Sequence, residues 1–217
     1  MKIAFLGQTH LSRTLADAAE IKGFEIAKEK DSDIIFVAPH VYDPSNLCAV
    51  DELMAHAIGF PSSIPVVLVS QVPPGYTRRW TERRKNIYYQ VDTIIMSKAL
   101  ERMLQPERII IGTDGSDVAK SYMDYLYMFN CPRLVMPYES AELCKLAINY
   151  YLTRQIEATN DLYAIAQSIG ANWDDILPAL RLDKRIGVQA YIVPGQPNEH
   201  LLRDVRTIEG MLCNQTH

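Results

Sequence analysis

Short apolar runs alternate with segments of helical periodicity over the first two thirds of the chain. Residues 2–6 form an apolar run that ends at Gly7, and the next segment has apolar residues at helical spacing until Gly23. Further apolar runs, typical of buried strands, lie at 24–27, 33–38, 66–69, 109–111 and 134–136. Helical segments are predicted between them, at 46–58, 77–84, 97–104 and 116–128. This alternation predicts an α/β fold, a doubly wound parallel sheet with helices on both faces.

The pattern changes after Pro137. Residues 140–169 keep helical periodicity without a proline or glycine, which predicts one helix about 45 Å long with Ser140 as its N-cap. A helix of this length exceeds the diameter of a small domain and often packs against a partner subunit. Asn172 is predicted to cap a short helix, and a last helix is predicted near 200–212. We therefore expect two domains, residues 1–137 around the sheet and residues 138–217 built from helices.

Composition and charge narrow the classes of function. The chain has 217 residues, 48% of them hydrophobic, and a net charge of −4, which favours a small soluble ligand over nucleic acid or an anionic membrane. A basic cluster around Trp80 is interrupted by Glu82 and does not change this expectation. The four cysteines form no CxxC pair, and no apolar run reaches membrane-spanning length, so we expect a cytoplasmic protein without a metal site.

The first strand-turn-helix segment has the place of a dinucleotide-binding turn. In the GxGxxG pattern, glycines let the backbone approach a diphosphate at the helix N-terminus. Here the three positions are Gly7, Thr9 and Ser12, so only the first glycine is present. An acidic residue is expected after the second strand, but the aligned position is Lys30, with Glu29 beside it. From these residues alone, a working cofactor site and an inherited but empty fold both stay open.

Four blocks in the same order resemble the UDP-glucose and GDP-mannose (nucleotide-sugar) 6-dehydrogenase family. Residues 69–77, Val-Ser-Gln-Val-Pro-Pro-Gly-Tyr-Thr, are similar to the family's STVPPGTT segment. The stretch from Ser97 to Gly112 resembles the segment after its PEF motif. Residues 141–149 resemble its central-helix motif, and residues 182–187 resemble its DxRIG motif. The resemblance extends over residues 66–204.

The resemblance implies an architecture and a cofactor. It implies a Rossmann-like NAD-binding domain, shortened between Ala27 and Ile34, then a long central helix and a small all-α dimerisation domain. The 140–169 helix would form a homodimer. The family's C-terminal UDP-binding domain is expected to be absent, because the chain ends before it could begin. NAD would be contacted by Gly7, Thr9, Ser12, Glu29 and Ser70.

The family oxidises a sugar alcohol twice with NAD, and a cysteine captures the intermediate aldehyde as a thioester precursor. Lys145 and Asn149 match the family's catalytic lysine and asparagine, spaced so that both face one side of the helix. Gln71 replaces the threonine of STVPPG, and Asp92 aligns with the glutamate of the PEF motif. For the matched residues a solvated surface role is the alternative.

The family's cysteine motif, GGSCFxKD, aligns with residues 197–204 once two residues are gapped. His200 then stands at the cysteine and Asp204 at the aspartate. Without the gap, Leu202 stands at the cysteine, so either alignment removes the nucleophile. An imidazole can act as a base near neutral pH but cannot form a thioester. Arg185 matches the arginine that reaches across the dimer to a nucleotide sugar, with a salt bridge to Asp183 as the alternative.

Two functions of different classes follow. The first is an NAD-dependent nucleotide-sugar oxidoreductase, altered or weakened by the loss of the cysteine. The second is a non-catalytic dimeric or partner-subunit protein that retains the dehydrogenase fold. The second rests on Thr9, Gln71 and His200, which replace the family's second turn glycine, threonine and cysteine.

Overall fold

The computed structural model describes residues 1–92 and 96–215. The chain consists of two compact units, Met1–Lys145 and Leu146–His217. The long helix α6, Tyr138–Ile169, therefore contributes its first turns to the sheet-containing unit and the remainder to the second unit. Within the described residues, no helix combines the length and the apolar character needed to cross a membrane.

The first unit is built on one seven-stranded sheet with the strand order β2-β1-β3-β4-β5-β6-β7. Strands β1 to β5 pair in parallel, β5 and β6 pair antiparallel, and β6 and β7 are again parallel to each other. The predicted α/β sheet is confirmed, with a reversal at β6 that the pattern did not predict. The strands are β1 (Lys2–Leu6), β2 (Glu25–Ile26), β3 (Ile34–Val37), β4 (Val66–Leu68), β5 (Ile87–Gln90), β6 (Ile109–Thr113) and β7 (Arg133–Pro137).

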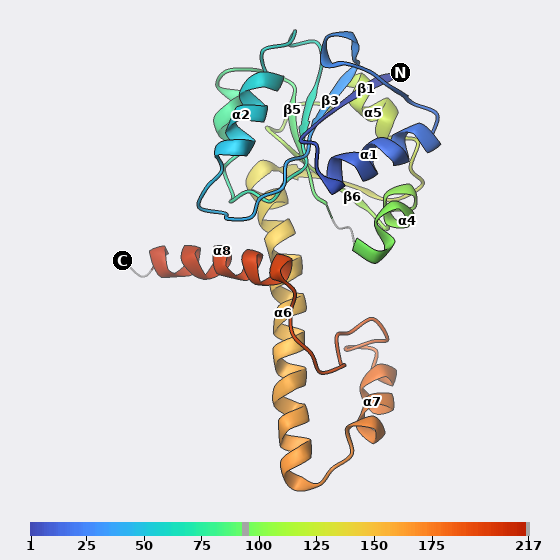
Figure 1. Ribbon diagram of the computed structural model, residues 1–217, viewed down its shortest axis with the longest axis vertical. Helices are drawn as coiled ribbons and strands as arrows, with labels where there is room; N and C mark the ends of the chain where they lie inside the picture. Colours follow the sequence, from blue (N-terminus) through green and yellow to red (C-terminus); the bar gives the residue numbers. More distant parts are fainter. Residues whose placement is uncertain (93–95, 216–217) are drawn as a thin grey trace. The chain divides into compact units, whose positions relative to one another are not determined.

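Helices cover both faces of this sheet, as expected. Figure 1 shows α2 on one face and α1 with α5 on the other. Two apolar cores correspond to the two faces, and neighbouring residues of one strand alternate between them, as Ile34 and Ile35 do. The helices and 3-10 turns of this unit are α1 (His10–Ile21), η1 (Glu29–Asp31), α2 (Cys48–Ala57), α3 (Arg78–Thr81), η2 (Met96–Lys98), α4 (Ala99–Leu104) and α5 (Lys120–Leu126).

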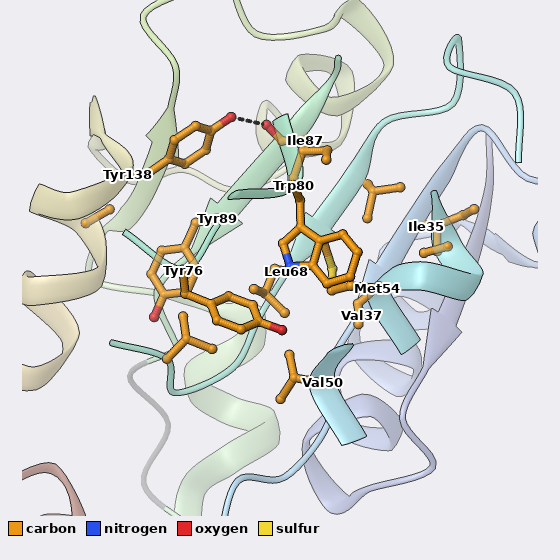
Figure 2. Packing of buried hydrophobic residues seen from close by; sticks show 14 of the residues in the cluster. Ile35, Val37, Val50, Met54, Leu68, Tyr76, Trp80, Ile87, Tyr89 and Tyr138 are labelled. Atoms are coloured by element: carbon orange, nitrogen blue, oxygen red, sulfur yellow. Dashed lines mark hydrogen bonds between the residues drawn. The ribbon is translucent and has the colours of Figure 1, made fainter. Parts of the chain in front are cut away.

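The start of α6 packs directly on the sheet (Figure 2). Tyr138 is buried, and its hydroxyl donates a hydrogen bond to the carbonyl of Ile87 (2.6 Å). A Cβ on Gly112 would lie 3.1 Å from the Cβ of Ala141, so the glycine permits this close approach of helix and strand. The helix begins immediately after β7. Ser140 is therefore inside the first turn, and its predicted role as N-cap was wrong.

The basic cluster around Trp80 consists of Arg78, Arg79, Arg83, Arg84 and Lys85, and one of these residues is an internal structural residue. Arg84 is buried, and its guanidinium donates to the carbonyls of Ala57 (3.0 Å), Phe60 (2.8 Å) and Pro61 (2.8 Å) and to that of Ile64. Burial lowers its pKa. These bonds hold the turn after α2 against the segment that leads into β5, so this arginine serves the fold.

The second unit contains the rest of α6, then α7 (Trp173–Leu182) and α8 (Glu199–Gln215). The predicted cap of α7 is confirmed, because the Asn172 side chain accepts from the amide of Asp174. The connecting segment 183–198 is bonded to α6 through side chains. Asn160 donates to the carbonyl of Gly195 (2.8 Å) and accepts from its amide (3.0 Å), and Thr159 donates to the carbonyl of Tyr191 (2.7 Å).

The carboxyl ends of β1 and β3 come very close at Gly7. Its φ is +126°, in the range that favours glycine, and a Cβ placed there would lie 2.5 Å from the carbonyl oxygen of Ala38. The oxygen belongs to the backbone and cannot move away cheaply. Gly7 is thus required both by its own conformation and by the neighbouring strand.

We predict that Gly7→Ala lowers the free energy of unfolding by about 3 kcal/mol or more, because strain at positive φ adds to a backbone clash. Gly23→Ala is the matched control. Gly23 also has a positive φ, +87°, but a Cβ placed on it would meet nothing within 4 Å, so we expect a loss of about 1 kcal/mol. Urea unfolding measures both. Equal losses in the two variants would contradict the clash.

Candidate functional site

The turn between β1 and α1 is closed by its own side chains. Thr9 is the N-cap of α1, and its hydroxyl accepts from the amide of Ser12 (3.0 Å), while the Ser12 hydroxyl accepts from the amide of Thr9 (2.8 Å). The Thr9 hydroxyl also donates to the carbonyl of Ala38 (2.8 Å), 29 residues away. Thr9 and Ser12, which stand at the second and third glycine positions of the GxGxxG pattern, are thus bonded to each other, and Thr9 is also bonded to the end of β3.

A third predicted cofactor residue reaches the same short stretch. Ser70 is buried after β4, and its hydroxyl donates to the carbonyl of Pro39 (3.2 Å). Its own carbonyl accepts from the hydroxyl of Tyr89 (2.9 Å). The peptide stretch Ala38–Pro39 is therefore where Gly7, Thr9 and Ser70 come together. Glu29 lies in η1, half-buried, with its carbonyl bonded to the hydroxyl of Ser32 (2.8 Å).

The segment that resembles STVPPGTT is anchored by a carboxylate from α6. Glu142 is fully buried, and its two oxygens accept from the amides of Gly75 (2.6 Å) and Thr77 (2.8 Å). Burial raises the pKa of Glu142, although the hydrogen bonds from Thr77 and Gly75 act in the opposite direction. Pro73 and Pro74 have no amide hydrogen, so Gly75 offers the first backbone donor after them.

The same segment is tied to α2 through Tyr76. The buried Tyr76 donates to a carboxylate oxygen of Asp51 (2.6 Å), and the guanidinium of Arg79 lies 4.5 Å from its ring centroid. Figure 2 shows Tyr76 beside Trp80 in the apolar core. Burial and the Asp51 carboxylate raise the pKa of Tyr76, so the phenol stays protonated. Its position gives it a structural role.

The other predicted residues of this unit are partly or fully enclosed. Asp92 follows β5 and is 9% exposed, and Gln71 is half-buried after β4. Both lie just beyond the carboxyl ends of neighbouring parallel strands, the edge at which open α/β sheets bind ligands. Lys145, at the end of this unit, is 8% exposed, which is uncommon for a lysine.

In the second unit the structure brings together two predicted catalytic residues and one that sequence reasoning missed. Asn149 donates from Nδ2 to a carboxylate oxygen of Asp204 (2.6 Å). The other oxygen of Asp204 accepts from Nε of Arg203 (2.9 Å) and lies 2.8 Å from its Nη2. Asp204 and Arg203 are 1% and 3% exposed, so this ion pair is buried. We name these three residues the Asp204 cluster.

His200 and Arg185 lie elsewhere on this unit. His200 is exposed in the first turn of α8, four residues before Asp204. Arg185 is exposed, and its guanidinium donates two hydrogen bonds to Asp183, from Nε (3.0 Å) and from Nη2 (2.6 Å). The salt bridge, the structural alternative for Arg185, is therefore present, and a role in binding sugar nucleotide stays a prediction.

Sequence reasoning missed Arg203, Glu142 and Tyr76 as members of these arrangements. Arg203 adjoins Asp204 in the motif, and a basic residue beside an aspartate was the available signal. Glu142 lies in the central-helix block three residues before Lys145, but its partners, Gly75 and Thr77, are more than 60 residues away. No spacing rule in the sequence predicts that contact.

Comparison with known proteins agrees with this architecture. Residues 139–200 match the UDP-glucose/GDP-mannose dehydrogenase family, central domain. The UDP-glucose 6-dehydrogenase of Rhizobium meliloti is 29% identical over 180 residues, which cover 72% of this chain and 40% of that protein. The chain thus spans less than half of this relative's length.

Two solved structures share the fold at lower identity. A UDP-glucose dehydrogenase from Pyrobaculum islandicum superposes with a TM-score of 0.79 at 20% identity, covering 97% of this chain and 64% of that one. A UDP-D-ManNAc dehydrogenase from Pyrococcus horikoshii gives 0.80 at 15% identity, covering 95% and 63%.

Fold and motifs together resemble those of the nucleotide-sugar dehydrogenases. The chain is a divergent relative of the UDP-glucose/GDP-mannose dehydrogenase family, and its residues 139–200 carry that family's central domain.

We predict that Glu142→Gln lowers the free energy of unfolding by about 2 kcal/mol, because an amide offers one acceptor oxygen to two buried N–H groups. Glu139→Gln, one turn earlier on α6, is the matched control and should cost less than about 1 kcal/mol, since its ion pair with Arg78 is exposed. Urea unfolding of both variants is the measurement. A control as damaging as Glu142→Gln would refute the anchoring role.

The Arg78–Glu139 pair predicts a pH dependence. The hydrogen bond from Arg78 lowers the pKa of Glu139 from 4.5 to about 2. A lowered carboxyl pKa stabilises the fold above the unfolded value of 4.5, and this contribution is lost as the pH falls towards 2. Arg78→Gln should raise the Glu139 pKa towards 4.5 in an NMR titration, while the backbone hydrogen bond to Glu139 still lowers it somewhat. An unchanged pKa in that variant would show that another group lowers it.

Proposed function

We propose that the chain is an NAD-dependent nucleotide-sugar oxidoreductase of the UDP-glucose 6-dehydrogenase type, with chemistry reduced by the loss of the cysteine. The observation that carries the proposal is the Asp204 cluster, a buried ion pair that orients a residue matching the family's catalytic asparagine. Burying charged groups is costly unless they are paired and hydrogen-bonded. A buried ion pair in such a small helical unit therefore suggests a role beyond stability.

The cluster suggests a division of roles. Asp204 holds the Asn149 amide by one N–H, and we assign the second N–H to the reacting sugar oxygen, which carries developing negative charge. Arg203 holds the Asp204 carboxylate in place and is thus a positioning residue. Lys145 is assigned to the same oxygen by its match to the family's lysine. Asp92 and His200 are the groups we assign to proton transfer.

Bound NAD would supply the hydride acceptor. Gly7 and the N-terminus of the 12-residue helix α1 fit a diphosphate, because the backbone comes close and the helix end attracts an anion. Thr9 and Ser12 do not fit it in the family's manner, since their side chains already accept the turn's own amides. Glu29 and Ser70 complete the proposed contacts.

The replacement of cysteine by His200 determines the expected product. Without a thiolate, the aldehyde formed in the first oxidation has no covalent route to the acid. We therefore assign to this chain one two-electron step, between the sugar alcohol and the aldehyde. Arg185 is assigned to the nucleotide sugar, once its bond to Asp183 is exchanged for the diphosphate.

A homodimer through α6 belongs to the same proposal. Large apolar side chains of the second unit are exposed along this helix, at Tyr151 (72%), Leu162 (50%), Ile165 (54%) and Ile169 (73%). The last three follow one another at spacings of three and four residues and so lie on one side of the helix. An apolar stripe of this kind supports packing against a second copy.

A second candidate function has its own observation. The self-capped turn at Thr9 and Ser12 favours a non-catalytic dimeric or partner-subunit protein that keeps the fold without the cofactor. NAD binding separates the two candidates.

We predict that saturating NAD raises the thermal unfolding temperature, since ligand at about a hundredfold over its dissociation constant adds about 2.7 kcal/mol of stability. With UDP-glucose present, NADH should form and the sugar product should be the aldehyde.

Asn149→Ala should lower kcat about 100-fold, because it removes a donor to the reacting oxygen. Ser168→Ala, exposed further along α6, is the control.

Three outcomes would count against this function. An NAD-insensitive unfolding temperature favours the non-catalytic candidate. Formation of the sugar acid would refute the single oxidation step. Full activity in Asn149→Ala would refute the role given to the Asp204 cluster.

A further inference from the structure

The sheet has a point at which its connections change direction, between β1 and β3. Strand β2 lies on one side of β1 and β3 on the other, so the loops that follow β1 and β3 leave the sheet next to each other. In open α/β sheets, ligands bind in the crevice outside the carboxyl ends of the strands at such a point. Whatever joins these two loops therefore controls access to that crevice.

In this chain the two loops are joined by one side chain. The Thr9 hydroxyl, 29 residues from Ala38 in sequence, donates to its carbonyl at 2.8 Å. We call this hydrogen bond the Thr9 bridge. The Thr9 hydroxyl oxygen also accepts from the amide of Ser12 at 3.0 Å. The hydroxyl thus donates to the residue after β3 and accepts from the first turn of α1.

The bridge is supported from both sides. The Ser12 hydroxyl accepts from the amide of Thr9 (2.8 Å) and donates to its carbonyl (3.0 Å), so this one hydroxyl holds the Thr9 backbone both as acceptor and as donor. Ser12 is 4% exposed, which keeps these bonds from competing with water. On the β3 side, Gly7 packs against the same carbonyl of Ala38.

We propose that Thr9 is a specificity-determining residue that closes this crevice and weakens dinucleotide binding. A diphosphate needs the first-turn amides of α1 and a close backbone approach, and Thr9 places its own hydroxyl oxygen on the Ser12 amide. This inference rests on the proposed NAD function. It adds that binding is limited by one side chain and not by loss of the fold.

The test compares NAD titrations by calorimetry for the whole chain and three variants. Thr9→Gly removes the bridge and still suits an N-cap, so it should fold and bind NAD about tenfold more tightly than the unsubstituted protein. Thr9→Ser keeps the hydroxyl and should bind as the unsubstituted protein does. Thr14→Ala removes another buried hydroxyl of α1, bonded at 2.9 Å to the carbonyl of His10, and should leave NAD binding unchanged.

A second measurement is independent of NAD. The Ser12 amide, now bonded to the Thr9 hydroxyl, should exchange its hydrogen faster in Thr9→Gly while the amides in the middle of α1 keep their protection. Thermal unfolding verifies that the variant is folded. If Thr9→Gly does not fold, Thr9→Ala is judged by the same titration.

Each outcome decides something. Tighter binding by Thr9→Gly supports the inference. If only Thr9→Gly binds NAD, the Thr9 bridge is supported and the proposed function of the natural chain is overturned. If both bind equally, or the variant binds more weakly, the inference is overturned and the NAD function stands. If neither binds, both are overturned.

Discussion

The buried carboxylate of Glu142 is the interaction on which the geometry of the sheet-containing unit depends. It comes from the first turns of α6 and accepts the amides of Gly75 and Thr77, so the loop after β4 is held by the helix that follows the last strand. A carboxylate without exposure is costly, and these two bonds offset part of that cost. The loop then carries Tyr76 into the core, where the phenol reaches Asp51 on α2. One charge thus connects α6, the loop after β4 and α2, and the carboxyl edge of the sheet takes its shape from them.

Polar groups at the two candidate sites differ in what they contact. At the β1 turn, Thr9 and Ser12 use their hydroxyls on backbone groups of the protein itself. In the second unit, one carboxylate oxygen of Asp204 accepts from Arg203 and the other accepts from Asn149, a side chain that matches a catalytic residue of the family. In the proposed function, the first arrangement would close a ligand site and the second would orient a group for chemistry. This contrast is why the cofactor and the catalytic parts of the proposed function call for separate experiments.

Most of the fold was predictable, and the errors have physical causes. The apolar runs at 2–6, 33–38 and 66–69 became β1, β3 and β4 because strands covered by helices on both faces need apolar side chains at every position. The strand Ile87–Gln90 was missed because its sequence, Ile-Tyr-Tyr-Gln, carries polar hydroxyl and amide groups and lacks the continuous apolar run that marked β3 and β4. The antiparallel pairing of β5 and β6 was missed because strand direction leaves no mark on side-chain alternation. Ser140 was wrong as an N-cap because β7 passes into α6 without a loop.

The sequence by itself determined the α/β class, the long helix, the relation to nucleotide-sugar dehydrogenases and the positions where the family's residues are replaced. These follow from local periodicity and from ordered motifs. Only the tertiary structure decided what the replacing and matching residues contact. Thr9 meets Ala38 across 29 residues, Asn149 meets Asp204 across 55, and Thr77 meets Glu142 across 65. The reason is physical: a buried polar group must find a partner wherever the packed chain places one, and that partner is specified by topology and not by neighbouring residues.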